Sequence, residues 1–129
     1  MKKNQQLLLS AAQAMEKAYA PYSKLKVGAA ILTPSDNIYA GCNVENISYP
    51  CGTCAEAGAI SAMVAAGEYK ISKILIISNG KNTIKPCGAC LQRIKEFSDK
   101  STEIIVSSFE KDFTSYKLSD LLPTPFEEF

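Results

Sequence analysis

Two short segments of the sequence carry side chains that could bind a metal ion and move protons. Thr53-Cys54-Ala55-Glu56 offers one thiol and, two residues later, a carboxylate, and Pro86-Cys87-Gly88-Ala89-Cys90 offers two thiols. Three sulfur ligands suit zinc, which prefers tetrahedral coordination by nitrogen and sulfur. Three protein ligands leave one position for water, and a nearby glutamate can move the protons of that water. The sequence therefore predicts one catalytic Zn²⁺ per subunit, with Cys54, Cys87 and Cys90 as ligands and Glu56 as the acid–base group.

A second arrangement of the cysteines stays open at this point. Cys51 and Cys54 form one Cys-x-x-Cys pair, and Cys87 and Cys90 form another. Together they could close a four-thiolate structural zinc site with no position for water and no catalysis. The separation between the two pairs is longer than the roughly 15–20 residues usual in such sites, which favours the catalytic interpretation.

The absence of histidine narrows the possible chemistry. No residue of the sequence is His, which excludes Ser-His-Asp and Cys-His nucleophile arrangements and every histidine-liganded metal site. The cysteine count of five is odd, and free thiols are typical of a reducing compartment. The only apolar run near the N-terminus, Leu7-Leu8-Leu9, is shorter than the roughly 7–15 residues of a secretory signal. These features predict a cytoplasmic protein.

Composition sets the scale of the molecule and limits its partners. A length of 129 residues predicts one domain, residues 1–129, and 47% hydrophobic with 21% charged residues is ordinary for a globular protein. The net charge is +1 and the lysines are scattered, which predicts no nucleic-acid partner. No segment is apolar over the length of a membrane span, so no membrane association is expected.

The elements that must position the thiols follow from the hydrophobic pattern. Residues 4–19 are predicted to form a helix capped by Asn4, with one buried face consisting of Leu8, Ala11, Ala12, Met15 and Tyr19. Residues 26–33 and 38–43 read as a hairpin around a turn at 34–37. The apolar run at 72–78 predicts a strand buried on both faces, and further strands are expected at 102–107 and 113–117.

Both cysteine segments are expected at helix N-termini. One helix is predicted from Thr53 to about residue 66, with Gly67 as its left-handed C-terminal residue, and another from Pro86 to about residue 97. Residues 118–122 are expected to form a helical turn. Backbone N–H groups and the helix dipole favour thiolates at such positions. The spacing of Thr53 and Glu56 also fits a capping box, in which Glu56 would serve only the helix end. The alternation of helices and strands predicts an α/β layer fold.

The motifs in order resemble the cytidine deaminases, a family of zinc-dependent nucleoside deaminases for which the cysteine signature is characteristic. The resemblance rests on Cys-Ala-Glu at 54–56 and Pro-Cys-x-x-Cys at 86–90. It extends to Pro-Tyr-Ser-Lys at 21–24, Val-Gly-Ala-Ala at 27–30, Gly-Cys-Asn-Val-Glu-Asn at 41–46 and Ser-Tyr-Pro at 48–50, with a weaker match at Leu-Leu-Pro, 121–123. It implies a three-layer α/β/α fold with a mixed sheet of about five strands. It also implies hydrolytic deamination of cytidine and deoxycytidine to uridine and deoxyuridine, releasing ammonia, in pyrimidine salvage.

The resemblance also implies roles for residues outside the metal site. Asn43 and Glu45, which alternate on an extended segment and so point the same way, would hold the ribose 3′-hydroxyl. The backbone of Ala55 would contact the base, and Leu25 would pack against the pyrimidine where relatives carry an aromatic residue. Tyr49 and Phe126 would be lent to neighbouring sites of a homotetramer.

One departure from the family pattern concerns charge. Many relatives carry arginine directly after Cys-Ala-Glu, whereas this sequence has Ala57. Arg93 is the only arginine of the chain, and it is the candidate to offset the negative charge of the sulfur ligands. Two alternatives to a cytidine deaminase remain: a deaminase of another amino-pyrimidine nucleoside, and a non-catalytic protein with the four-cysteine zinc site.

Overall fold

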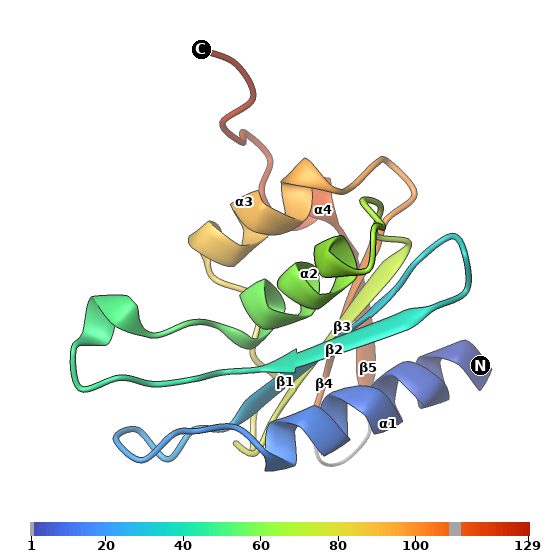
Figure 1. Ribbon diagram of the computed structural model, residues 1–129. Helices are drawn as coiled ribbons and strands as arrows, with labels where there is room; N and C mark the ends of the chain where they lie inside the picture. The colour runs from blue at the N-terminus through green and yellow to red at the C-terminus, as the bar shows by residue number, and fades with distance from the viewer. Residues whose placement is uncertain (1, 109–111) are drawn as a thin grey trace.

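The computed structural model describes residues 2–108 and 112–129, and its centre is a mixed five-stranded sheet (Figure 1). The strands are β1 (Val27–Leu32), β2 (Ile38–Cys42), β3 (Lys73–Ser78), β4 (Glu103–Ser107) and β5 (Phe113–Lys117), in the spatial order β2-β1-β3-β4-β5. β3 and β4 are parallel, and the other neighbouring pairs are antiparallel. All five strands were predicted within about a residue of these bounds.

Helix α1 (Lys2–Glu16) covers one face of the sheet. Its buried residues Leu7, Ala11 and Met15 pack against alternate residues of the central strands, including Ala30 and Leu75. Successive strand residues point to opposite faces, so the intervening strand residues pack against the helices on the other face. A strand covered on both faces therefore has apolar residues at every position.

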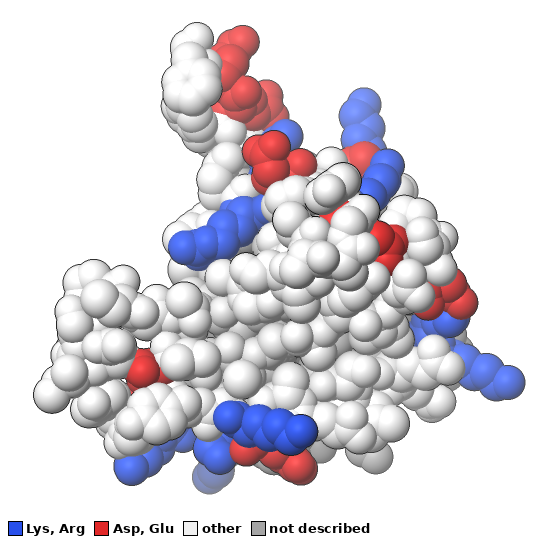
Figure 2. Space-filling model, in the orientation of Figure 1, with Lys and Arg blue, Asp and Glu red and all other residues white. Residues whose placement is uncertain are grey.

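The opposite face carries α2 (Ala55–Ala65), α3 (Gly88–Glu96) and the short α4 (Leu118–Leu121). Their apolar residues join the sheet side chains Ala29, Ile31, Ile74 and Ile76 in the larger core cluster. The sheet thus lies between two helical layers, as the three-layer α/β/α prediction requires. Figure 2 shows cationic and acidic side chains interspersed around the edge of the displayed face, without a continuous cationic stripe.

The predicted N-terminal helix was right in kind and wrong at both ends. α1 contains Asn4 as its third residue, where the side-chain oxygen accepts a hydrogen bond from Lys73 Nζ at 3.2 Å, so Asn4 is not the cap. The helix ends at Glu16, and Tyr19 instead forms a bridge with Val44 and is exposed. Leu7, rather than Leu8, is the fully buried leucine.

The helices that carry the cysteines begin later than predicted. Cys54 is the N-cap of α2 and Cys87 the N-cap of α3, so neither Thr53 nor Pro86 opens its helix. Thr53 instead pairs with Val44, with backbone hydrogen bonds of 2.9 and 3.0 Å. Because Glu56 is the second residue of α2, the Thr53–Glu56 capping box was wrong. Gly67 does adopt the predicted left-handed conformation, with a φ of 86°.

Candidate active site and metal centre

A cavity of about 650 Å³ lies where α2 and α3 begin. Its lining brings together the four residues predicted to form the metal site, Cys54, Glu56, Cys87 and Cys90. The same lining contains Asn43 and Glu45, which come from the segment after β2. Residues far apart in the sequence therefore share one concave site.

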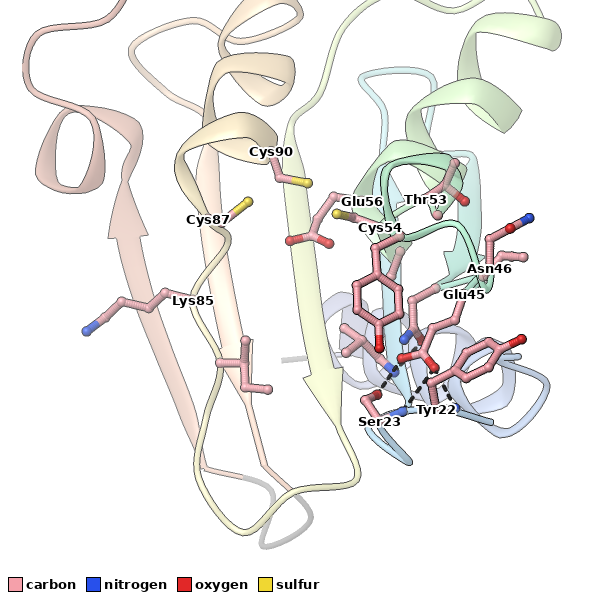
Figure 3. Close-up of a pocket in the computed structure, with 17 residues that line it drawn as sticks. Tyr22, Ser23, Glu45, Asn46, Thr53, Cys54, Glu56, Lys85, Cys87 and Cys90 are labelled. Atoms are coloured by element: carbon pink, nitrogen blue, oxygen red, sulfur yellow. Dashed lines mark hydrogen bonds between the residues drawn. The ribbon is translucent and has the colours of Figure 1, made fainter. Parts of the chain in front are cut away.

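Local backbone geometry places two of the thiols. Cys54 has φ −80° and ψ 157°, and Cys87 has φ −74° and ψ 171°, both extended conformations typical of an N-cap. Neither side chain caps its own helix, so both sulfur atoms are available to the cavity. Cys90 lies in the first turn of α3 and is 1% exposed. Figure 3 shows the three sulfur atoms and the Glu56 carboxylate turned toward one another.

The chemistry of this donor set fits zinc. Three thiols at two facing helix starts supply the soft ligands that Zn²⁺ prefers, and the single carboxylate among them comes from α2. Within residues 2–108 and 112–129, no group of three Cys, Asp or Glu side chains lies close enough together to hold a metal ion without some movement. Cys54 and Cys90 interact directly, and Cys87 lies at the more exposed side of the cavity.

Burial controls the protonation of the two inner groups. Burial raises the pKa of the Cys90 thiol, and the neighbouring Glu56 carboxylate and Cys54 raise it further. The sequence had suggested that helix N-termini would favour thiolates, but at Cys90 loss of hydration outweighs the helix dipole. Burial likewise raises the pKa of Glu56, which is only 6% exposed, while its own backbone N–H and the charge of Arg93 act in the opposite direction.

Arg93 lies one helical turn after Cys90 on α3, so the two side chains share a face. Its Nη1 donates to Cys90 Sγ at 3.4 Å, and this bond lowers the pKa of that thiol against the stronger effect of burial. Among the described residues, no other cationic side chain hydrogen-bonds a cysteine. The only arginine of the sequence therefore lies against one of the three thiols, and its role in offsetting their charge stays a prediction.

The other side of the cavity is a loop held by Asn43 and Glu45. Glu45 Oε1 accepts hydrogen bonds from the backbone N–H groups of Tyr22 and Ser23 at 3.0 and 3.1 Å, and its Oε2 accepts the Ser23 hydroxyl (Figure 3). The Ser23 hydroxyl is the main reason that the pKa of Glu45 is lowered. Asn43 accepts from the Val27 N–H and donates to the Leu25 carbonyl, both at 2.8 Å.

The remaining predicted site residues divide between the cavity and the outer surface. Ala55 and Tyr49 line the cavity. Leu25 does not, since its side chain turns toward Gly80 on the outer side of the loop. Phe126 also lies outside the lining, because its backbone pairs with the Gln92 side-chain amide at 2.8 and 3.2 Å and its ring contacts Phe129.

Cys51 lies outside the lining and is exposed, with its thiol against the Ser48 hydroxyl at 3.6 Å. This position does not favour a fourth sulfur ligand. Tyr22 and Ser23 line the cavity but were not predicted as site residues. The available signal was their motif, Pro-Tyr-Ser-Lys, immediately before a strand. None of the described helices has the length and apolar character needed to cross a lipid bilayer.

Solved structures share this architecture. Cytidine deaminase from Burkholderia pseudomallei superimposes with a TM-score of 0.89 and 39% identity, over 95% of this chain and 98% of that one. Cytidine deaminase from Mycobacterium tuberculosis gives a TM-score of 0.83 and 32% identity, over 96% and 97%. The α/β/α sheet with thiols at two helix starts is therefore the cytidine-deaminase fold.

Sequence comparison agrees with the fold. The family model described as "Cytidine and deoxycytidylate deaminase zinc-binding region" matches residues 1–107. The cytidine deaminase of Sporosarcina psychrophila is 35% identical over 124 residues, 96% of this chain and 91% of that protein. That of Halalkalibacterium halodurans is 35% identical over 95% and 92%. The chain belongs to the cytidine deaminase family.

Proposed function

We propose that this protein hydrolyses cytidine and deoxycytidine to uridine and deoxyuridine, with release of ammonia, and that it serves pyrimidine salvage. The observation that carries the proposal is the cavity itself. Three thiols and a buried carboxylate converge on one side, and Asn43 and Glu45 hold the other. A base at the thiols and a sugar at the two polar side chains would together fill such a site.

Cys54, Cys87 and Cys90 would hold one Zn²⁺ in each subunit, closing around it as the thiols lose their protons. When bound, zinc supplies an activated water as the nucleophile for C4 of the pyrimidine. Three thiolates and one divalent ion leave one net negative charge, and the Arg93 guanidinium beside Cys90 Sγ offsets it.

Glu56 would carry the proton transfers. Its carboxylate would accept one proton from the attacking water and deliver it to N3, and would then take the second proton from the new C4 hydroxyl and pass it to the leaving amine. One carboxylate suffices because the attacking oxygen, N3 and the leaving amine are all bonded to the same carbon, C4, and so lie within reach of the Glu56 oxygens. The buried position of Glu56, 6% exposed, keeps these protons from exchanging freely with solvent.

At the other side, Asn43 and Glu45 would bind the ribose 3′-hydroxyl while the backbone of Ala55 contacts the base. These paired hydrogen bonds make the enzyme prefer a nucleoside over free cytosine, because a base without sugar leaves polar groups unpaired. Tyr49 and Phe126 are proposed to pack around bases, lent between subunits of a homotetramer. The exposure of Tyr49 at 79% and of Phe126 at 62% supports that assignment. Leu25, which was expected to pack against the pyrimidine, lies outside the cavity lining and is not proposed in that role.

We also propose that residues 1–129 form a single domain and that the protein works in the cytoplasm on free nucleosides. Support for the compartment comes from the cysteines, since Cys42, Cys51, Cys54, Cys87 and Cys90 are all unpaired thiols.

The direct test is the loss of ultraviolet absorbance when purified protein is mixed with cytidine. Activity should disappear with a chelator and return with added zinc. Glu56→Gln should keep its zinc and lose at least about 100-fold in kcat, the usual contribution of a general acid–base group. Glu96→Gln, an exposed change on α3, is the matched control and should behave as wild type.

A Glu56→Gln enzyme with a near-normal rate would contradict the mechanism. A wild-type protein that turns over another amino-pyrimidine nucleoside in preference to cytidine would keep the chemistry and correct the substrate. A protein that holds zinc tightly, turns over none of these nucleosides and releases the metal on Cys51→Ser substitution would instead support the four-cysteine structural site.

A further inference from the structure

The loop at residues 20–27, which forms the cavity wall through Tyr22, Ser23 and Val27, is anchored along its whole length. Each of its backbone N–H groups from residue 22 to residue 27 donates a hydrogen bond. Glu45 accepts two of these bonds and Asn43 accepts one, both from the cavity side. An irregular segment held this completely has a defined shape, because its backbone groups are paired within the protein.

On the outer side of the same loop, Asn79, which follows β3, makes hydrogen bonds to the loop backbone. Asn79 Oδ1 accepts from the Lys26 N–H at 3.0 Å, and Nδ2 donates to the Lys24 carbonyl at 3.1 Å. Its backbone N–H also donates to the Lys26 carbonyl, at 3.0 Å. Asn79 itself does not line the cavity.

These bonds fix a costly backbone conformation. Lys24 has a φ of 64°, in the left-handed region that non-glycine residues rarely adopt. The Asn79 side chain binds the carbonyl of this residue and the amide two residues later, on either side of Leu25. Without these bonds the segment would relax toward an ordinary conformation, and the relaxation would move Ser23, whose N–H and hydroxyl both bind Glu45.

We infer that Asn79 is a positioning residue for substrate binding, which acts through the 20–27 loop to set the orientation of Asn43 and Glu45 toward the sugar. The inference rests on the proposed function of those two residues. Because the thiols and Glu56 are carried by α2 and α3, loss of the Asn79 side chain leaves the metal and proton-transfer groups in place.

The test compares Asn79→Ala with Asn82→Ala, the same substitution three residues later at an exposed position that makes none of the loop hydrogen bonds. For Asn79→Ala we expect a KM for cytidine about tenfold higher, with kcat and zinc content unchanged, since about two neutral hydrogen bonds are lost. Preference for cytidine over free cytosine should fall with it. Asn79→Asp, which keeps the acceptor for the Lys26 N–H, should lie between Ala and wild type.

Wild-type KM and wild-type preference for cytidine in Asn79→Ala would overturn the inference while leaving the proposed function intact. A lower kcat at unchanged KM, with a lower unfolding temperature, would also overturn it, because this is the signature of a general loss of folded enzyme. A wild-type protein that does not deaminate cytidine would overturn the proposed function and this inference together.

Discussion

Gly41 lies where the sheet packs closely against α2, the helix that carries Glu56 and has Cys54 as its N-cap. It lies in β2, and a Cβ atom built there would be 2.4 Å from the backbone N of Ala59, 2.6 Å from the carbonyl carbon of Gly58 and 2.8 Å from the Ala55 oxygen. All three atoms belong to the backbone of α2, so no flexible side chain can move aside. Only a glycine fits at this position.

The size of the perturbation follows from these distances. Ordinary contact begins at 3.4 Å, so Gly41→Ala must push α2 away from the sheet by about 1 Å, the difference from 2.4 Å. Overpacking of this kind costs about 1–3 kcal/mol of unfolding free energy. Since α2 carries Glu56 and is capped by Cys54, and a 1 Å misplacement can cost about 100-fold in rate, we expect kcat/KM to fall by about that factor.

The assay is urea unfolding of the zinc-loaded protein together with kcat/KM for cytidine. Both variants should be compared at one protein concentration, because the stability of the proposed homotetramer would depend on concentration. The control is Gly58→Ala on the facing helix, whose added Cβ would meet Gly41 Cα at 3.5 Å, an ordinary contact. Alanine in a helix interior is favoured over glycine by about 1 kcal/mol, so the control should be slightly more stable and fully active. Gly41→Ala with wild-type stability and rate would refute the reasoning.

Three further predictions address charge, pH and metal. Arg93→Gln should weaken zinc retention about fivefold in competition with a chromogenic chelator, because a partly exposed charged hydrogen bond to Cys90 is lost, whereas Lys95→Gln on the same helix should not. Glu68, bound by Asn37 Nδ2 and Tyr39 Oη, has a pKa lowered to about 2; it contributes stability above pH 4.5 that is lost as the pH falls through about 2. Glu68→Gln should therefore lower the unfolding temperature at pH 7, and its difference from wild type should shrink below pH 4.5; an equal difference at pH 7 and pH 2 would contradict this. Chelation should abolish activity and lower the unfolding temperature, and zinc should restore both.

The fold was largely predictable because its strands are bounded by turn residues and filled by apolar runs. The phase of α1 was not. Leu7, Leu8 and Leu9 are equally apolar, and the pattern alone does not say which one faces the sheet. Gly28 permits the observed packing, since a Cβ there would lie 2.0 Å from the Ala11 oxygen and 2.8 Å from the Met15 nitrogen on the buried side of the helix. Such a contact joins residues that no local pattern connects.

The convergence of Cys54, Cys87 and Cys90 on one cavity was predictable for the opposite reason. Two facing helix starts can each deliver a thiol from an N-cap, and Cys87 and Cys90 come from one turn of one helix, so the arrangement leaves a short signature in the sequence. The bonds that shape the 20–27 loop leave no such signature. Asn79 reaches Lys26 and Lys24 across 53 and 55 residues, and nothing about an isolated asparagine after a strand indicates such partners.

The roles of Asn43 and Glu45 are hard to interpret from sequence, because both side chains also anchor a loop. Their alternation predicted that both side chains point the same way, and in the structure both bind the backbone of the loop at residues 22–27. Both Glu45 oxygens and both ends of the Asn43 amide already hold backbone or hydroxyl groups of residues 22–27. A carboxylate oxygen can accept more than one hydrogen bond, so Glu45 can hold the wall and still receive a sugar hydroxyl. Under the proposed role of Asn43 and Glu45, substrate recognition and loop anchoring share one set of hydrogen bonds, so a change on the outer side of the loop should raise KM and leave kcat unchanged.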